Sequence, residues 1–467
     1  MNGPAVARTS EGDGAKSLSR SQTAFLVAAL VMSVISFQLN ATMLGPAIRD
    51  INTELGPDAF ASMASYFYLS GAIANVVLTR WSDFVGRRRV LIGIMIVLCI
   101  GTVLCIVSSS LPVVLLGRVL QGGCNVTFGL AFLILRQRLS GPAFGFCCGV
   151  IASINGGVGG VDALVGGFMV DHFGYRSIFV LILAVGVAAI VLAVYAVPAD
   201  DPGDAASGRM DWVGAALIAL TVAGIDLFLV RGGHSGWTSP VALGFIAAAI
   251  VALLAFVVVE RRTANPLIHI DVLRSRYAWP LIAVTILCLA SFTMVLSYIV
   301  PSIAENDDIG FGASGEMTAL LFLTPAAVAQ LISSPLVGRL AMRIGFVTVL
   351  RAGLIATVPV GAVLAYFAFE QNALVVLIPV LGFTFGGVVG TALAVLGVMQ
   401  APPNEPGSLP GLTNAAFGVG SSVGFAWAGP IVAQGTAAGF QSALWISVAI
   451  GVVALGMGFV LKPRLSR

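Results

Sequence analysis

The sequence predicts an all-helical integral membrane protein with fourteen transmembrane helices. Apolar residues make up 58% of the 467 residues and charged residues only 10%, whereas a soluble domain carries about a quarter charged residues. The mean hydropathy is +1.01. Lys and Arg gather in alternate short segments between apolar runs, as loops on one side of a membrane do. The net charge of +3 gives no reason to expect nucleic acid as a partner.

Fourteen apolar runs approach or exceed the about 20 residues that span a bilayer. They cover 22–46, 58–79, 89–109, 112–136, 143–170, 177–197, 212–230, 240–260, 278–303, 315–337, 345–368, 373–399, 407–434 and 440–461. Because their number is even, both termini are expected on one side. The first run is longer than the apolar part of a cleavable signal peptide, and the preceding residues 1–21 form a polar tail.

The basic residues predict which side that is. Twenty of the 24 Lys and Arg residues fall in the tails or in loops on the same side, while the opposite loops hold only Arg49, Arg176 and Arg231. Cytoplasmic loops carry the excess of Lys and Arg. We therefore expect a multi-pass protein of the cell (inner or plasma) membrane with both termini cytoplasmic.

The loop Trp81-Ser-Asp-Phe-Val-Gly-Arg-Arg-Arg-Val-Leu91 joins the second and third runs and is the most informative segment. Asp83 and Gly86 are suited to a tight turn, and Arg87, Arg88 and Arg89 follow directly. Residues 338–345, Gly-Arg-Leu-Ala-Met-Arg-Ile-Gly, repeat this loop incompletely after the tenth run. The repetition predicts two six-helix halves, a plan found in many transporters.

The pattern D-x-x-G-R-R/K-R resembles the signature of the major facilitator superfamily of secondary transporters. Further segments resemble its fourteen-spanner drug/proton antiporters. These are residues 40–48, 117–123, 175–179, 211–214, 260–268 and 414–424. The resemblance implies the major facilitator fold and proton-coupled efflux of hydrophobic or amphipathic compounds by alternating access.

The same plan divides the chain into five parts. An N-terminal half spans 22–197, an inserted helix pair with its flanking loops spans 198–276, and a C-terminal half spans 277–462. The tails are residues 1–21 and 463–467. Asp83, Gly86 and Arg87 to Arg89 would form the gating motif. Asp83 would pair with nearby basic groups or a helix N-terminus across the seam between the halves and so hold the outward-open state.

The departures from the antiporter pattern bear on proton coupling. Asn40 stands where that branch usually carries an acidic residue in the first helix, and Asp162 replaces a glycine in the fifth. Counted at about 1.5 Å per residue, Arg118 and Asp162 lie about 9 Å and about 12 Å below the same membrane edge. We predict that Asp162 carries the proton, with Arg118 tuning it and Asn40 at similar depth. The alternative is a structural ion pair between Arg118 and Asp162.

Polar and aromatic residues on the helices predict the lining of the substrate cavity. The predicted residues are Gln121, Asn125, Asn155, Tyr66, Tyr68, Tyr298, Gln330, Phe417 and Trp427. They describe an apolar, aromatic pocket with few charges, which suits a neutral or weakly basic amphipathic molecule. Asp226 is expected to pair near the membrane surface outside this cavity, and Glu305 and Glu316 to lie at solvated helix ends.

Several classes of function are disfavoured. No nucleophile–base set or metal-ligand spacing is evident, so we expect no enzyme, cofactor or metal site, and the six cysteines are interpreted as packing residues. The expected partners are a small-molecule substrate, protons and the lipid bilayer, and the protein is expected to be monomeric. Two alternatives to drug efflux remain: a specific metabolite exporter or importer, and a sensor that has lost transport.

Overall fold

The computed structural model describes residues 19–139, 147, 150–151, 161–200, 210–263, 267, 275–400 and 408–463, and its regular elements there are all helical. Within these ranges thirteen helices are long and apolar enough to cross a membrane. The remaining expected run, 143–170, lies partly outside the described residues, but 161–173 are helical. The predicted fold class is therefore confirmed.

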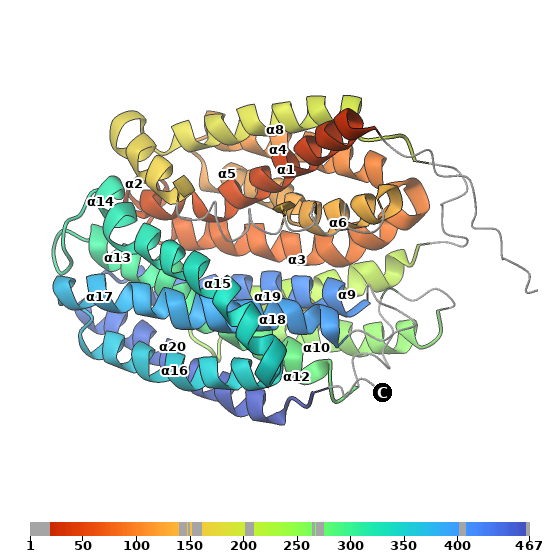
Figure 1. The fold of residues 1–467 in the computed structure, drawn as a ribbon. Helices are drawn as coiled ribbons and strands as arrows, with labels where there is room; N and C mark the ends of the chain where they lie inside the picture. The colour runs from red at the N-terminus through yellow and green to blue at the C-terminus, as the bar shows by residue number, and fades with distance from the viewer. Residues whose placement is uncertain are drawn as a thin grey trace, which may run out of the picture.

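The helices of the N-terminal half lie together in Figure 1, where α1 and α4 pack against α8, and α5 against α3 and α4. Ser19 begins α1 with a capping box to Gln22. The elements are α1 (Arg20–Thr42), the 3-10 turn η1 (Gly45–Ala47), α2 (Ile48–Leu55), α3 (Ala59–Val85), α4 (Arg87–Val107), α5 (Leu111–Gly122), the 3-10 turn η2 (Gly123–Val126), α6 (Thr127–Arg138) and α8 (Arg176–Ala196).

The C-terminal half differs in containing π-helical segments, η4 to η7, within its long helices. In order, its elements are α12 (Trp279–Cys288), η4 (Leu289–Thr293), η5 (Val295–Ile299), α13 (Val300–Glu305), α14 (Gly315–Thr318), η6 (Ala319–Leu323), α15 (Thr324–Ile344), α16 (Phe346–Tyr366), α17 (Gln371–Leu381), η7 (Gly382–Gly390), α18 (Thr391–Met399), α19 (Ser408–Val432) and α20 (Ala437–Val460).

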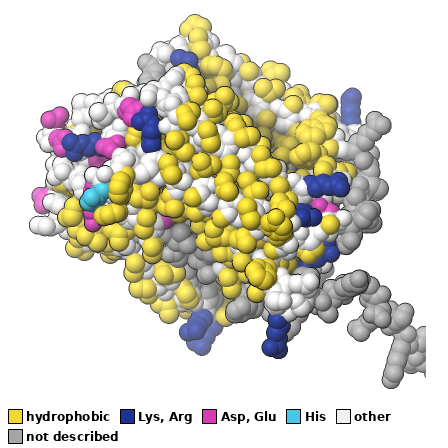
Figure 2. Space-filling model, turned by 90° about the horizontal axis from the view of Figure 1, so that it is seen from above, with side chains coloured by type: hydrophobic (Ala, Val, Ile, Leu, Met, Phe, Trp, Pro, Cys, Tyr) yellow, Lys and Arg dark blue, Asp and Glu magenta, His cyan; other side chains and the backbone are white. Residues whose placement is uncertain are grey.

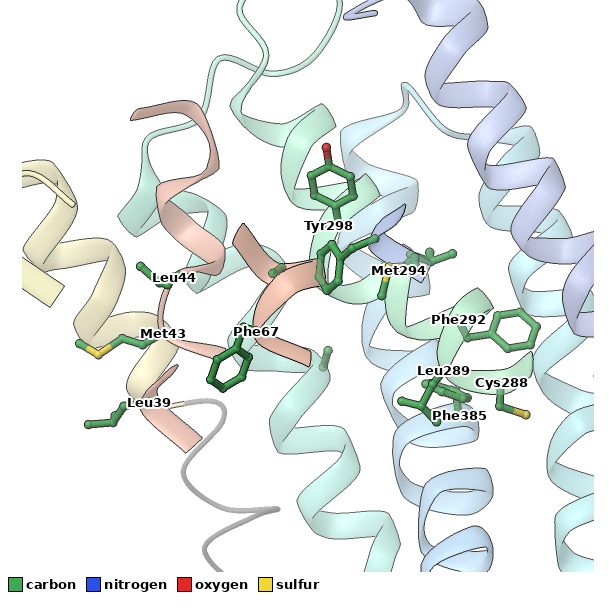
Figure 3. Packing of buried hydrophobic residues seen from close by; sticks show 14 of the residues in the cluster. Leu39, Met43, Leu44, Phe67, Cys288, Leu289, Phe292, Met294, Tyr298 and Phe385 are labelled. Atoms are coloured by element: carbon green, nitrogen blue, oxygen red, sulfur yellow. The ribbon is translucent and has the colours of Figure 1, made fainter. Parts of the chain in front are cut away.

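The inserted pair, α9 (Trp212–Ser235) and α10 (Pro240–Glu260), forms a hairpin beside the seam between the halves. α9 contacts both α3 of the N-terminal half and α19 of the C-terminal half, which also pack extensively on each other (Figure 1). Figure 3 shows Phe67 of α3 and Tyr298 of η5 in the buried core near this seam. The inserted pair thus contacts both six-helix halves, which are expected to move relative to each other during transport.

The two repeated loops share one backbone conformation. Gly86 ends α3 with φ 106° and ψ 137°, and Gly345 ends α15 with φ 90° and ψ 139°. Side chains with a Cβ rarely adopt such positive φ values, which explains the glycine at both positions. The sequence repetition therefore reflects a shared turn geometry.

Charged side chains gather at the two ends of the molecule, and an apolar belt separates them (Figure 2). The belt exposes large apolar side chains, such as Val107 at 71% and Leu254 at 63%, as expected where lipid is the solvent. We call the end with Asp83 and Arg87 to Arg89 the basic end. The end with Asp171, Glu305 and Asp307 is called the acidic end.

Candidate substrate and proton site

Arg118 is the centre of a buried polar network in the N-terminal half. Only 2% of Arg118 is exposed. Its Nη1 donates to Asn40 Oδ1 at 3.0 Å and to Gln121 Oε1 at 2.7 Å, and its Nη2 donates to the Asn40 carbonyl at 3.3 Å. The guanidinium also lies 4.3 Å from the centre of the Phe67 ring, a cation–π contact.

Neighbouring groups complete the network. Arg118 Nε donates to the Met63 carbonyl at 3.3 Å, and Gln121 Nε2 donates to Thr102 Oγ1 at 2.8 Å. The network therefore joins α1, α3, α4 and α5. Because each charge-assisted bond has a neutral acceptor, the site keeps the positive charge of the guanidinium in a largely apolar interior.

Asp162, on the helix 161–173, is also buried, with 3% exposed. Thr42 Oγ1 donates to its Oδ2, and Oδ1 has no hydrogen-bond partner within the described residues. Thr42 stands two positions after Asn40 at the end of α1. Helix α1, which carries Asn40 at the position where an acid was expected, thus hydrogen-bonds with Arg118 through Asn40 and with Asp162 through Thr42.

The structural ion pair between Arg118 and Asp162, considered as the alternative, is not formed in this conformation within the described part of the chain. Asn40 and Gln121 accept from the guanidinium instead. That Asp162 carries the proton remains a prediction.

An aromatic cluster crosses the seam next to this network. Tyr68 of α3 stacks on Phe425 of α19, with ring centres 6.0 Å apart and planes at 8°. Tyr298 of η5 lies 5.5 Å from Phe425 and 5.6 Å from Phe60 of α3. Tyr68 also contacts the ring of Phe67, on which Arg118 rests. Both halves thus contribute rings to one largely buried aromatic cluster.

The other predicted cavity residues lie at varied places. Asn125 has an amide nitrogen without a partner among the described residues, and it packs so closely on Gly71 that a Cβ there would be 2.2 Å from that nitrogen. Trp427 Nε1 donates to the Ala290 carbonyl at 2.9 Å, a contact within the C-terminal half. The remaining positions are Tyr66, half-buried on α3; Gln330, packed on glycines of η7; Phe417, half-buried on α19; and Asn155, outside the described residues.

The gating motif does not cross the seam in this conformation. Asp83, in the last turn of α3, interacts with Arg80 of the same helix at 3.5 Å and with Arg87, the first residue of α4, at 3.3 Å. Arg87 Nη1 donates to the Leu133 carbonyl of α6, and Arg88 N donates to Asp200. Asp83 thus pairs with nearby basic groups, and the partners of the motif belong to the N-terminal half and the linker after it. A contact of Asp83 across the seam in the outward-open state stays a prediction.

The seam is instead closed at the acidic end. Asp171, near the end of the helix 161–173, accepts from the backbone N–H groups of Gly315 at 3.0 Å and Glu316 at 2.9 Å. These are the first N–H groups of α14, so a carboxylate from one half caps a helix of the other. A methyl group on Gly167 would lie 2.6 Å from the Gly315 carbonyl, which shows how closely the two helices approach.

A second contact reinforces this closure. The backbone N–H of Arg49 donates to Glu305 at 2.8 Å, and the Arg49 guanidinium pairs with Asp307 at 2.6 Å. Glu305 is 4% exposed, so it does not line a solvated helix end as expected. Sequence reasoning missed these gate residues because each acid alone resembles an ordinary loop charge.

Comparison with known proteins identifies the family. Residues 30–425 match the family model of the Major Facilitator Superfamily. The chain belongs to the major facilitator superfamily. A relative described as a uridine/deoxyuridine transporter, from Lactococcus lactis subsp. cremoris (strain MG1363), is 32% identical over 412 residues, which cover 86% of this chain and 85% of the relative.

A second relative of this superfamily member is the multidrug resistance protein Stp of Mycobacterium tuberculosis (strain CDC 1551 / Oshkosh). It is 27% identical and covers 89% of this chain and 77% of its own length. Among solved structures, the POT family transporter PepTSo has a TM-score of 0.65 at 14% identity, covering 95% of this chain and 98% of its own. The protein is thus a multi-pass membrane protein of a transporter family.

Proposed function

We propose that this superfamily member is a proton-coupled transporter of neutral, ring-containing organic molecules, with pyrimidine nucleosides as its substrate class. The proposal depends on one observation: the guanidinium and amides of Arg118, Asn40 and Gln121 lie beside an aromatic cluster, with no acid on α1. A site without that acid has less to attract a cationic drug. Amides and a guanidinium instead match the carbonyl and hydroxyl groups of a nucleoside.

The aromatic cluster suits the base of such a substrate. Tyr68 and Phe425 come from opposite halves and stack on each other. Separation of the halves would therefore expose the stacked face of each ring, and a planar substrate ring could bind between them. Aromatic rings stack favourably on one another in offset arrangements. The similarity to a relative described as a uridine/deoxyuridine transporter supports this substrate class.

Proton coupling is assigned to Asp162. Within the described residues it is a buried carboxylate with no cationic partner, and one of its oxygens is unpaired. Ionisable groups inside transmembrane segments commonly serve as proton relays. Alternating access would then open the basic end while the contacts of Asp171 and Arg49 keep the acidic end closed. By the positive-inside rule the basic end is cytoplasmic.

A second candidate function is efflux of amphipathic compounds. An apolar groove of about 410 Å³ lies between the inserted pair and helices α3, α12 and α19, and Arg261 of the loop after α10 also borders it. Such a groove could admit a hydrophobic molecule from the bilayer. The similarity to a relative described as a multidrug resistance protein also favours this alternative.

Purified protein in proteoliposomes with an imposed pH gradient separates the two candidates. We expect radiolabelled uridine to accumulate only when the gradient is present, and unlabelled deoxyuridine to compete with it. Gradient-driven movement of a lipophilic dye without uridine movement would favour efflux instead. Uridine movement without dependence on the gradient would contradict the proton coupling and leave facilitated diffusion.

A further inference from the structure

Asp226 is a buried carboxylate on the inserted helix α9, and within the described part of the chain it takes no part in the hydrogen bonds of the network around Arg118. Its exposed fraction is 1%. Ser65 Oγ lies 2.9 Å from Oδ1 and 3.2 Å from Oδ2, and Ser422 Oγ lies 2.5 Å from Oδ1. Asp226 was expected to pair near the membrane surface outside the substrate cavity; its partners are instead serines of α3 and α19, which form the seam.

One carboxylate thus connects three structural units. Ser65 belongs to the N-terminal half, Ser422 to the C-terminal half and Asp226 to the inserted pair. Ser65 Oγ is also 3.1 Å from the Ser422 carbonyl, so the two halves touch at this point. Any movement of α3 relative to α19 must change the surroundings of the carboxylate.

The charge of Asp226 has little local compensation. The titratable and charged groups near it are Tyr66 on α3, which interacts electrostatically with both Asp226 and Arg231 of α9, and Asp58, which lines the same small cavity as Ser65. α19 contains no ionisable residue, and α10 contains only Glu260 at its far end. Within the described residues, the hydroxyls of Ser65 and Ser422 therefore provide the hydrogen bonds to a group that is expensive to bury as an anion.

A small, mostly apolar cavity, which three polar residues of the α3 end also line, leads toward this carboxylate from the acidic end. Asp58, Ser62 and Ser65 of α3 line it, together with Val230 of α9 and residues of α19 that include Pro430. Its volume is about 10 Å³, about the space needed for one water molecule. Ser65 belongs both to this cavity and to the carboxylate cluster, so the cavity and the carboxylate share a hydroxyl through which a proton can pass.

We propose that Asp226 is a second proton-binding site. Its protonation weakens the hydrogen bonds by which the inserted pair connects α3 and α19. As an anion, it accepts charge-assisted hydrogen bonds from Ser65 and Ser422 together. A proton arriving from the acidic end binds Oδ2, the oxygen with the longer serine contact. The neutral acid is a weaker acceptor, so the tie between the halves weakens. This inference extends the proposed alternating access.

Infrared difference spectroscopy of the reconstituted protein tests proton binding directly. Titration should produce a protonated-carboxyl band that is absent from Asp226→Asn and retained in Asp162→Asn. Identical protonated-carboxyl bands in the difference spectra of wild type and Asp226→Asn would overturn the proposal. The matched control is Thr221→Val on α9, since within the described residues the Thr221 hydroxyl donates to the Leu217 carbonyl of its own helix; its spectra should equal those of wild type.

Spin labels test the effect on the seam. Exposed positions Thr53 and Asp308, at the acidic end of opposite halves, would be labelled as Thr53→Cys and Asp308→Cys in a cysteine-free background. In nanodiscs, the distance distribution of wild type should change with pH, and Asp226→Asn should resemble wild type at low pH throughout. An unchanged pH response in Asp226→Asn would refute the proposal.

Two further measurements keep the outcome interpretable. If Asp226→Asn fails to fold, the double variant Ser65→Ala, Ser422→Ala retains the acid and should show a shifted carboxyl band and a weaker response of the labels to pH. An unshifted band would count against the proposal. Because both readouts require no substrate, failure of uridine transport would contradict the proposed function while leaving this test intact.

Discussion

The two halves of the protein differ in where they place charge. In the N-terminal half, Arg118 and Asp162 are buried in the helical bundle, and residues of α1 hydrogen-bond with both. In the C-terminal half, the charged residues of the helices fall within the first or last two turns, as Arg339, Arg351 and Glu305 do. Ion binding is thus expected to reside in the N-terminal half.

The C-terminal half differs in the regularity of its backbone. The π-helical segments of the described residues all lie there, in the helices that contain α12, α15 and α17. Segments of this kind are rare and often mark functional sites. The longest, η7, packs its glycines against α15, where a Cβ on Gly382 would lie 2.4 Å from the Ala326 carbonyl. We infer that one half supplies the chemistry and the other the deformable helices.

The largest effect should come from removing the acid of the N-terminal half. Asp162→Asn is expected to abolish pH-driven uridine accumulation in proteoliposomes while substrate binding stays measurable, because the amide cannot carry a proton. Adding Asn40→Asp should restore partial coupling. Thr42, two residues after Asn40 on α1, contacts Asp162, so an acid at position 40 would lie at a similar level to position 162. Asp308→Asn, exposed at the acidic end, is the control and should transport normally. Wild-type accumulation in Asp162→Asn would leave Asp162 as a structural residue.

The next effect should come from Arg118→Ala, which leaves the buried acceptors of Asn40 and Gln121 without their donor. Unsatisfied buried polar groups cost about 1–3 kcal/mol each, so both thermal stability in detergent and uridine affinity should fall. The counterpart in the C-terminal half, Gln330→Ala, should change both much less. Equal losses in the two variants would contradict the division of roles between the halves.

A smaller effect is expected at the contact between the halves. Asp171→Asn removes the negative charge that caps α14, and such charge–helix interactions contribute about 0.3–1 kcal/mol at exposed sites. The labels at positions 53 and 308 should therefore report a larger open fraction at the acidic end. Asp50→Asn is the control, because Asp50 lies at the same end but does not accept from the N–H groups of Gly315 and Glu316 as Asp171 does. An unchanged distance distribution in Asp171→Asn would show that the cap does not hold the gate.

The smallest effect should come from Asp83→Asn. Its pairs with Arg80 and Arg87 are partly exposed, and exposed ion pairs contribute about 0–1 kcal/mol. Expression and thermal stability should stay near those of wild type, and the uridine transport rate should fall modestly. A complete loss of transport with normal folding would instead show that Asp83 contacts the C-terminal half in another step of the cycle.

Much of the architecture was predictable because it depends on local properties of the chain. The lengths of the apolar runs set the spans, and the turn glycines Gly86 and Gly345 set the repeated loops. Counting residues along helices placed Asn40, Arg118 and Asp162 at a similar level, and the contacts of Asn40 with Arg118 and of Thr42 with Asp162 agree with that. Thr42 stood beside Asn40 in the same motif, but only its contact with Asp162 shows its role.

Pairing between helices was not predictable from the sequence. Whether Arg118 meets Asp162 or Asn40, whether Asp226 faces lipid or the seam, and whether Asp171 caps another half all depend on how each helix is rotated and which neighbour it packs against. In a soluble helix a polar stripe indicates that rotation. Here nearly every helix face is apolar, because lipid and protein interior are equally apolar solvents. The sequence therefore determined the spans, loops and depths, and only tertiary packing decided the partners.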